Sequence, residues 1–224
     1  MRGDTIYAVS TAPGRAGVAV IRVSGPKSGR ALLALTGKPP PAARVATVAR
    51  LRDAAGHHID EGLILYFVSP ESFTGEDVAE FHSHGERATV GAALSALGAL
   101  GLRPAEAGEF TRRAFEHGKL DLTQVEGLGD LISAETEGQR RQALARMDGG
   151  LLRAVEKWRD ELLDLQAEIE ARLDFSDEGD VGAVLPGWVP QRAVALAGAL
   201  ADAAALFEHG RIVREGFRVA LAGP

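Results

Sequence analysis

Residues 76–101 read EDVAEFHSHGERATVGAALSALGALG, and the spacing of their apolar side chains changes at Glu86. From Val78 to Ser83, residues alternate in the period of two that is typical of a half-buried strand. After Glu86, apolar residues recur every three or four positions, which is the period of a helix. These are Val90, Leu94, Leu97 and Leu100. A strand followed directly by a helix predicts a fold that mixes the two.

The sequence around this stretch predicts further strands and short helices. Segments rich in Val and Ile and bounded by Gly or Pro predict strands at residues 5–11, 17–25, 45–53 and 61–70. Helices are predicted at 26–37 and 108–119, where Gly37 and Gly118 stand at the positions that end a helix. We therefore expect an α/β domain over residues 1–118.

Beyond Gly118 the pattern is helical throughout. Apolar stripes at helical spacing run through residues 120–147, 151–175 and 189–213, and each segment is predicted to be one long helix. An acidic loop follows the second segment. The stripe on 151–175 consists of Trp158, Leu162, Leu165, Ile169 and Leu173. The predicted class is α+β, with a helical domain over 119–216 and a strand in 217–224.

Composition narrows the possible functions. The chain has 224 residues and no cysteine, which excludes disulfides, thiolate nucleophiles and cysteine-ligated metals within it. Its net charge is −6, which disfavours binding of nucleic acid through bulk electrostatics but leaves a local RNA contact open. There is no signal-peptide pattern and no uninterrupted apolar run near 18 residues. These features predict a cytoplasmic protein that does not bind membranes.

The stretch SFTGEDVAEFHSHG (72–85) concentrates polar side chains on a predicted strand. His82 and His84 would share one face of that strand, which permits a metal site, but no third histidine or cysteine lies near them. An exposed polar face is therefore favoured over a metal site. A carboxylate fixed on a strand can also accept two parallel hydrogen bonds from a pterin or guanine edge. Glu80 is the candidate for that role.

Arg22 and Lys119 are two further candidates. Arg22 lies inside the apolar strand predicted at 17–25, and arginine is rarely buried without a partner. Either an internal ion pair with Glu80 or a contact to an anion or carbonyl in a pocket fits this position. Lys119 follows Gly118 at the domain junction, where solvated surface is the commoner outcome for a lysine and a cleft-facing role is the alternative.

Four blocks of sequence together resemble the MnmE family of tRNA modification GTPases, also called TrmE or ThdF. They are DTIYAVSTAPGRAGVAVIRVSGP (4–26), SFTGEDVAEFHSHG (72–85), GEFTRRAFEHGKLDLTQVEGLGDLISAET (108–136) and ARLDFSDEG (171–179). The resemblance covers the whole chain. It departs from the family at Ala107, where proline is common, and at Glu86, where glycine is usual. The second departure implies a different pocket mouth.

The resemblance implies an N-terminal domain that is similar to the folate domain of aminomethyltransferases. Such a domain would bind 5-formyl-tetrahydrofolate and form a homodimer. By position, the family's folate contacts fall on Arg22, Glu80 and Lys119. Glu80 would accept hydrogen bonds from the pterin amino edge, while Arg22 and Lys119 would hold polar or anionic parts of the cofactor.

The resemblance also implies a Ras-like G domain inserted into the helical domain. The segment RVALAGP (218–224) resembles its first strand, and Gly223 resembles the first glycine of a phosphate-binding loop, G-x-x-x-x-G-K-[ST]. The rest of that loop is absent from the sequence. The chain is therefore expected to be truncated at the start of the G domain and unable to hydrolyse GTP alone. GTP, K⁺ and Mg²⁺ are implied for the missing domain.

The implied reaction adds a carboxymethylaminomethyl-type group to C5 of the wobble uridine (U34) of certain tRNAs. The implied partner is the flavoprotein MnmG (GidA), and the folate is implied as the one-carbon donor. Two other interpretations stay open. One is a stand-alone folate-dependent one-carbon transferase that needs no G domain. The other is a non-catalytic dimerisation module in which Arg22 and Glu80 form a buried ion pair.

Overall fold

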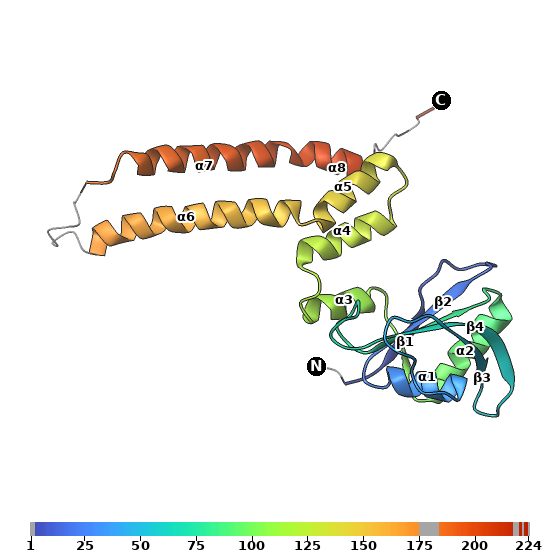
Figure 1. Cartoon of the computed structure of the whole chain (residues 1–224). Helices are drawn as coiled ribbons and strands as arrows, with labels where there is room; N and C mark the ends of the chain where they lie inside the picture. The colour runs from blue at the N-terminus through green and yellow to red at the C-terminus, as the bar shows by residue number, and fades with distance from the viewer. Residues whose placement is uncertain (1–2, 175–183, 217–219, 221, 224) are drawn as a thin grey trace. The chain divides into compact units, whose positions relative to one another are not determined.

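The computed structural model of the chain describes residues 3–174, 184–216, 220 and 222–223. The chain divides into two compact units, Met1–Asp121 and Leu122–Pro224 (Figure 1). Most of the acidic loop and residues 217–219, 221 and 224 of the predicted last strand lie outside the described residues. Gly223 is described and belongs to no helix or strand.

A mixed sheet of six strands lies at the centre of the first unit. The strands follow the spatial order β3-β4-β5-β2-β1-β6, and every neighbouring pair is antiparallel except β1 and β6. The two-residue β6 was not predicted, because two residues are too few to show an alternating pattern. The other five strands confirm the sequence interpretation. The bounds are β1 Ile6–Val9, β2 Ala19–Ser24, β3 Thr47–Arg52, β4 His58–Phe67, β5 Val78–Ser83 and β6 Arg103–Pro104.

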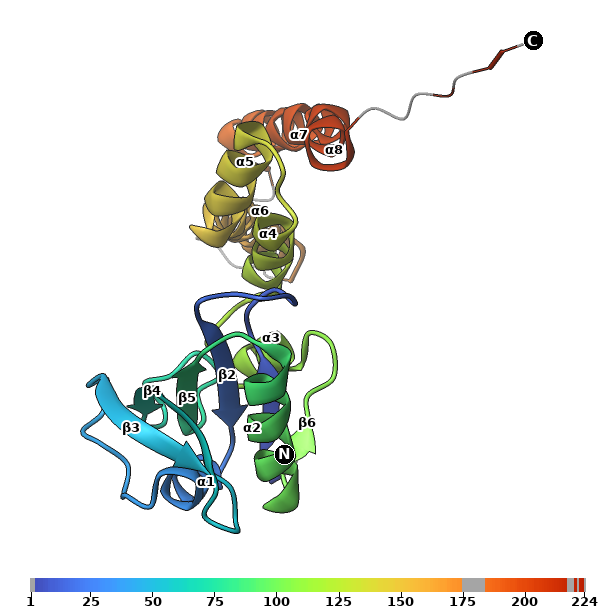
Figure 2. The same ribbon diagram turned by 90° about the vertical axis from the view of Figure 1, so that its right-hand side faces the viewer.

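One face of this sheet packs against α1 (Ser28–Thr36) and α2 (Arg87–Ala99), which Figure 2 shows beside the strands. Side chains of alternate strand residues form this core, since successive side chains of a strand point to opposite faces. The core includes Ile21, Val23, Ala79, Phe81, Leu32 and Leu97. The intervening residues of β2 and β5 therefore point to the opposite face.

Helix α3 (Glu109–Glu116) lies close to the end of the first unit, and Gly118 stands just beyond its C-cap residue His117, as predicted. Gly118 has a φ of 66°, a conformation that glycine adopts without steric cost. Its N–H donates to the carbonyl of Phe115 at 2.9 Å, and the N–H of Lys119 donates to that of Ala114 at 2.8 Å. This pair of bonds is the Schellman helix end. It fixes the backbone of Lys119 directly beyond the helix.

The second unit is helical, but two segments that were predicted as single helices are each divided. Thr136 and Gln139 form a capping box that starts a new helix within 120–147, because the cap supplies partners for its free N–H groups. The segment 189–213 is interrupted at Leu206. The helices are α4 Leu122–Ile132, α5 Glu137–Met147, α6 Gly150–Asp174, α7 Trp188–Ala205 and α8 Phe207–Glu215.

Helices α6 and α7 lie side by side (Figure 1) and share a small core of Leu165, Val189 and Leu196, with Trp158 packed against it. The stripe on α6 lies on one helix, as predicted, but only part of it is buried. Leu165 is 4% exposed, whereas Leu162 is 58% exposed. A pair of helices covers only the narrow strip of each that faces the other, so the rest of a broad stripe stays exposed.

One helical stretch of the second unit, Trp188–Arg214, is long and apolar enough to cross a membrane by length and composition alone. An 18-residue window within this stretch has a mean hydropathy of 1.2. This alanine-rich stretch was predicted as a helix but not as a membrane span, because it contains no uninterrupted apolar run near 18 residues. Val189 and Leu196 within it pack against Leu165 of α6, which accounts for two of its apolar residues without a membrane.

Candidate functional site

Arg22 and Glu80 form an ion pair on the sheet face opposite the core. They are direct neighbours in the register of β2 and β5. Nε and Nη2 of Arg22 lie 2.9 and 2.8 Å from Oε1 of Glu80, and Nε2 of His82 lies 3.2 Å from Oε2. All three side chains are half-buried. The internal ion pair that was one of two interpretations of Arg22 is therefore present.

Two phenylalanine rings flank the guanidinium of Arg22. Its Cζ lies 5.5 Å from the ring centroid of Phe73 and 5.9 Å from that of Phe110, which is within the range of cation–π attraction. Phe73 belongs to the loop between β4 and β5 (residues 68–77, the β4–β5 loop), and Phe110 belongs to α3. Sequence reasoning missed both rings, because chain order gives no signal that places them beside residue 22.

Lys119 lies against the same β4–β5 loop. A Cβ added at Gly75 would lie 3.4 Å from Cγ of Lys119 and 2.9 Å from Cβ of His117. The Lys119 side chain is exposed, and it has no hydrogen bond or ion pair with the residues that the structure describes. The structure thus joins Arg22 and Glu80 directly and places Lys119 beside the loop that supplies Phe73.

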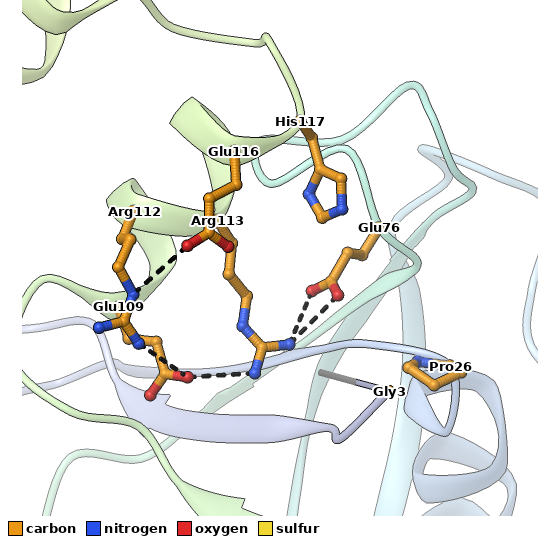
Figure 3. A pocket seen from close by; sticks show the side chains of 8 residues that line it. All are labelled: Gly3, Pro26, Glu76, Glu109, Arg112, Arg113, Glu116 and His117. Atoms are coloured by element: carbon orange, nitrogen blue, oxygen red, sulfur yellow. Dashed lines mark hydrogen bonds and ion pairs between the residues drawn. The ribbon is translucent and has the colours of Figure 1, made fainter. Parts of the chain in front are cut away.

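A network of buried charges holds this loop against α3. The side chain of Arg113, which is 6% exposed, binds Asp4 at 2.8 Å, Glu76 at 3.1 Å and Glu109 at 3.1 Å. Figure 3 shows Arg113 between Glu76 and Glu109. The hydroxyl of Ser24 on β2 donates to Glu76 at 2.7 Å. Arg113 thus links the N-terminal segment that carries Asp4 and the β4–β5 loop to its own helix, α3.

The network lines a cavity of about 620 Å³ (Figure 3). The charged groups of this cavity pair mainly with one another: Arg112 lies within ion-pair distance of Glu109 and Glu116, in addition to the contacts of Arg113. Charges that are already paired in this way leave few donors and acceptors for a ligand. The lining residues are Gly3, Pro26, Glu76, Glu109, Arg112, Arg113, Glu116 and His117.

The electrostatics of Glu109 agree with a structural role. Hydrogen bonds from Arg103, and then from the backbone of Glu106 and from Arg113, lower the pKa of this buried carboxyl to about 2 against the opposing effect of burial. Glu109 therefore stays ionised near neutral pH and serves as a fixed acceptor for the two arginines rather than as a proton donor.

The histidines of the strand contact different carboxylates. His82 lies beside Glu80, whereas His84 donates its backbone N–H to Asp60 at 2.7 Å and places Nδ1 2.9 Å from it. The hydrogen bond with Asp60 raises the pKa of His84. Within the described ranges, no group of three or more His, Cys, Asp or Glu residues could hold a metal ion. Glu86, just before α2, accepts a hydrogen bond from the hydroxyl of Thr89.

Comparison with known protein families assigns both units. The family model for the GTP-binding protein TrmE N-terminus matches residues 5–119. The model for the MnmE helical domain matches residues 122–218. The chain belongs to the MnmE family. The junction between the two MnmE family matches coincides with the division between the compact units at Asp121.

Individual MnmE relatives are similar over 78% to 98% of this chain. The tRNA modification GTPase MnmE of Phenylobacterium zucineum (strain HLK1) is 53% identical over 98% of this chain and 49% of its own length. That of Paramagnetospirillum magneticum is 59% identical over 78% of this chain and 40% of its own length. The tRNA modification GTPase MnmE of Maricaulis maris is 51% identical over 98% of this chain and 50% of its own length. The chain spans about half the length of these curated MnmE relatives.

Proposed function

We propose that the first unit binds 5-formyl-tetrahydrofolate at Arg22, Glu80 and Lys119, as part of a tRNA modification GTPase. The observation that carries this proposal is the Arg22–Glu80 pair on the sheet face away from the core, with Phe73 and Phe110 beside it. A carboxylate can bind the N–C–NH₂ edge of a pterin through two parallel hydrogen bonds. Aromatic rings can pack against the flat ring system. The aminomethyltransferase-like character of the domain is part of the same proposal.

Folate binding in this site requires Glu80 to change partners. A carboxylate offers about four lone-pair positions, two on each oxygen. Oε1 of Glu80 already accepts from two N–H groups of Arg22, and Oε2 lies beside His82. A pterin that engages both oxygens must displace one donor of Arg22. The displaced guanidinium is then free to hold a polar or anionic part of the folate.

The activity of the whole protein belongs to the proposal as well. With GTP, K⁺ and Mg²⁺ acting in a G domain, the protein would modify C5 of wobble uridine U34 together with MnmG in the cytoplasm, away from membranes. The first unit would supply the homodimer contact. Three functional parts stay predictions: a folate-binding and dimerisation domain over residues 1–118, a helical domain over 119–216 and the first strand of a G domain over 217–224. The 224 residues contain no G-x-x-x-x-G-K-[ST] pattern, so we expect no GTP hydrolysis by this chain alone, and Gly223 stays a predicted P-loop residue.

Isothermal titration calorimetry with 5-formyl-tetrahydrofolate tests the site. We expect saturable binding to the chain and a loss of at least about tenfold in affinity in Glu80→Gln, which keeps the shape of the side chain but removes the charged acceptor. Glu61→Gln is the matched control, since Glu61 is an exposed strand acid that pairs only with Arg50 among the described residues. Equal affinity of Glu80→Gln and the unmodified chain would reject Glu80 as the pterin ligand.

The ion pair itself favours one second candidate, a non-catalytic dimerisation module. Half-buried pairs such as Arg22–Glu80 often persist for structural reasons. This candidate predicts that the chain forms a dimer in light scattering while calorimetry detects no folate binding. The same pair of measurements therefore separates the two functions.

A further inference from the structure

A second hollow in the first unit lies between the β1–β2 loop and α2, and contains none of the predicted folate contacts. Its volume is about 660 Å³, which falls within the range of small-molecule sites. Most of its lining is aliphatic. The lining residues are Val9, Thr11, Ala12, Pro13, Gly14, Arg15, Ala16, Ala19, Gly85, Arg87, Val90, Gly91 and Leu94.

The loop that forms one wall is anchored at both ends. Near its start, the N–H of Val20 donates to the hydroxyl of Thr11 at 3.3 Å. Near its far end, the N–H of Gly85 donates to the carbonyl of Ala16 at 3.0 Å. A Cβ at Gly85 would lie 2.7 Å from that carbonyl oxygen, so this close approach requires glycine. The wall is therefore held in place by specific contacts.

One face of α2 forms the opposite wall. Arg87, Val90, Gly91 and Leu94 are three or four positions apart and so share a helix face. Gly91 has ordinary helical backbone, and a Cβ there would meet nothing within 4 Å. Glycine inside a helix is less stable than alanine, and no neighbour requires it here. Its effect on the structure is to leave the hollow open.

The charge of the hollow is positive. Arg15 and Arg87 line it, and no aspartate or glutamate does, although the whole chain carries a net charge of −6. In the part of the chain that the structure describes, neither guanidinium has a hydrogen-bond or ion-pair partner. Guanidinium groups bind carboxylates and phosphates through paired hydrogen bonds. The lining has no aromatic ring on which a nucleobase could stack.

We propose that this Arg15–Arg87 hollow binds a small amphiphilic anion. Its carboxylate or phosphate head contacts Arg15 and Arg87, and its aliphatic part lies against Val9, Val90 and Leu94. The site is separate from Arg22 and Glu80, so it stands independently of the folate proposal.

Calorimetry with octanoate as the probe tests this site in the 224-residue chain. We expect saturable binding, with octan-1-ol and inorganic phosphate each weaker by at least about tenfold because each lacks one half of the recognised chemistry. Gly91→Leu fills the hollow and abolishes binding. Ala92→Leu, which adds the same side chain to an exposed position of α2 outside the lining, leaves it unchanged.

The charge requirement is tested with a double variant. The variant that combines Arg15→Gln with Arg87→Gln should bind octanoate at least about tenfold more weakly. Arg30→Gln, at an exposed arginine outside the hollow, should leave the affinity for octanoate unchanged. Circular dichroism melts establish that each variant is folded. Absence of saturable octanoate binding, or equal binding by Gly91→Leu, would overturn the proposal. Phosphate that binds as tightly as octanoate, or tRNA binding that alone depends on the two arginines, would also overturn it.

Discussion

The guanidinium of Arg113 on α3 binds the carboxylate of Glu76 in the β4–β5 loop, with N–O distances of 3.2 and 3.1 Å. This contact joins the helix that carries Phe110 to the loop that carries Phe73, and both rings flank Arg22. A buried network therefore holds together the two segments that place these rings at the candidate folate site.

Arg113→Met is expected to destabilise the first unit strongly. The substitution leaves Asp4, Glu76 and Glu109 without their shared buried cation, and removal of one partner from a buried pair costs about 3–5 kcal/mol. Urea denaturation measures the change. Arg112→Met is the control, since Arg112 is 48% exposed and its ion pairs are 3.5 Å or longer; we expect about 0–1 kcal/mol there. Similar losses for the two variants would contradict a central role for Arg113.

Glu109 is expected to make stability depend on pH in the acid range. Its pKa is lowered in the folded state from 4.5 to about 2, chiefly by the hydrogen bond from Arg103. A lowered pKa means that the ionised carboxylate is stabilised more in the folded chain than in the unfolded chain. The contribution is therefore complete above about pH 4.5 and is lost as the pH falls toward about 2.

Glu109→Gln tests this dependence. The difference in free energy of unfolding between the unmodified chain and Glu109→Gln should be largest near neutral pH and should narrow below about pH 4.5. Urea denaturation at a series of pH values measures it. A difference that stays constant down to about pH 3 would show that Glu109 is not held ionised by Arg103 and Arg113.

Gly75→Ala should disturb both stability and folate binding. Gly75 has a φ of 76°, and its added Cβ would lie 2.9 Å from Cβ of His117. Gly101→Ala is the matched control, since Gly101 has a φ of 73° and open space around it. In the control, the free energy of unfolding should fall by about 1–2 kcal/mol because of the left-handed backbone alone. In Gly75→Ala it should fall by more, because the added Cβ also meets His117. Equal losses in thermal melts would mean that the loop yields to the added methyl group at no cost.

Leu165→Ala should destabilise the helical unit by about 2–5 kcal/mol, because Leu165 is the buried α6 residue in the core shared with α7. Leu162→Ala, at a largely exposed position of the same helix, should change the free energy of unfolding by less than about 1 kcal/mol. Thermal melts of the two variants measure the contrast. A melting temperature that is unchanged in Leu165→Ala would show that this contact does not stabilise the unit.

Much of the first unit could be predicted from the sequence, because its signals are local. The alternation from Val78 to Ser83, the change of period at Glu86 and the glycine at position 118 each reflect a backbone conformation that nearby residues impose. The divisions at Thr136 and Leu206 were missed, since the helical period continues across both and the capping box depends on only two side chains.

The sequence by itself determined the mixed sheet followed by helices, the family, and three residues to examine: Arg22, Glu80 and Lys119. Only the tertiary structure decided that Arg22 pairs with Glu80 across β2 and β5, that Phe73 and Phe110 flank it, and that Arg113 holds their segments together. The reason is physical. Periodicity and turn residues act over a few positions of the chain, whereas these contacts join residues tens of positions apart, and no local pattern encodes which distant side chains will meet.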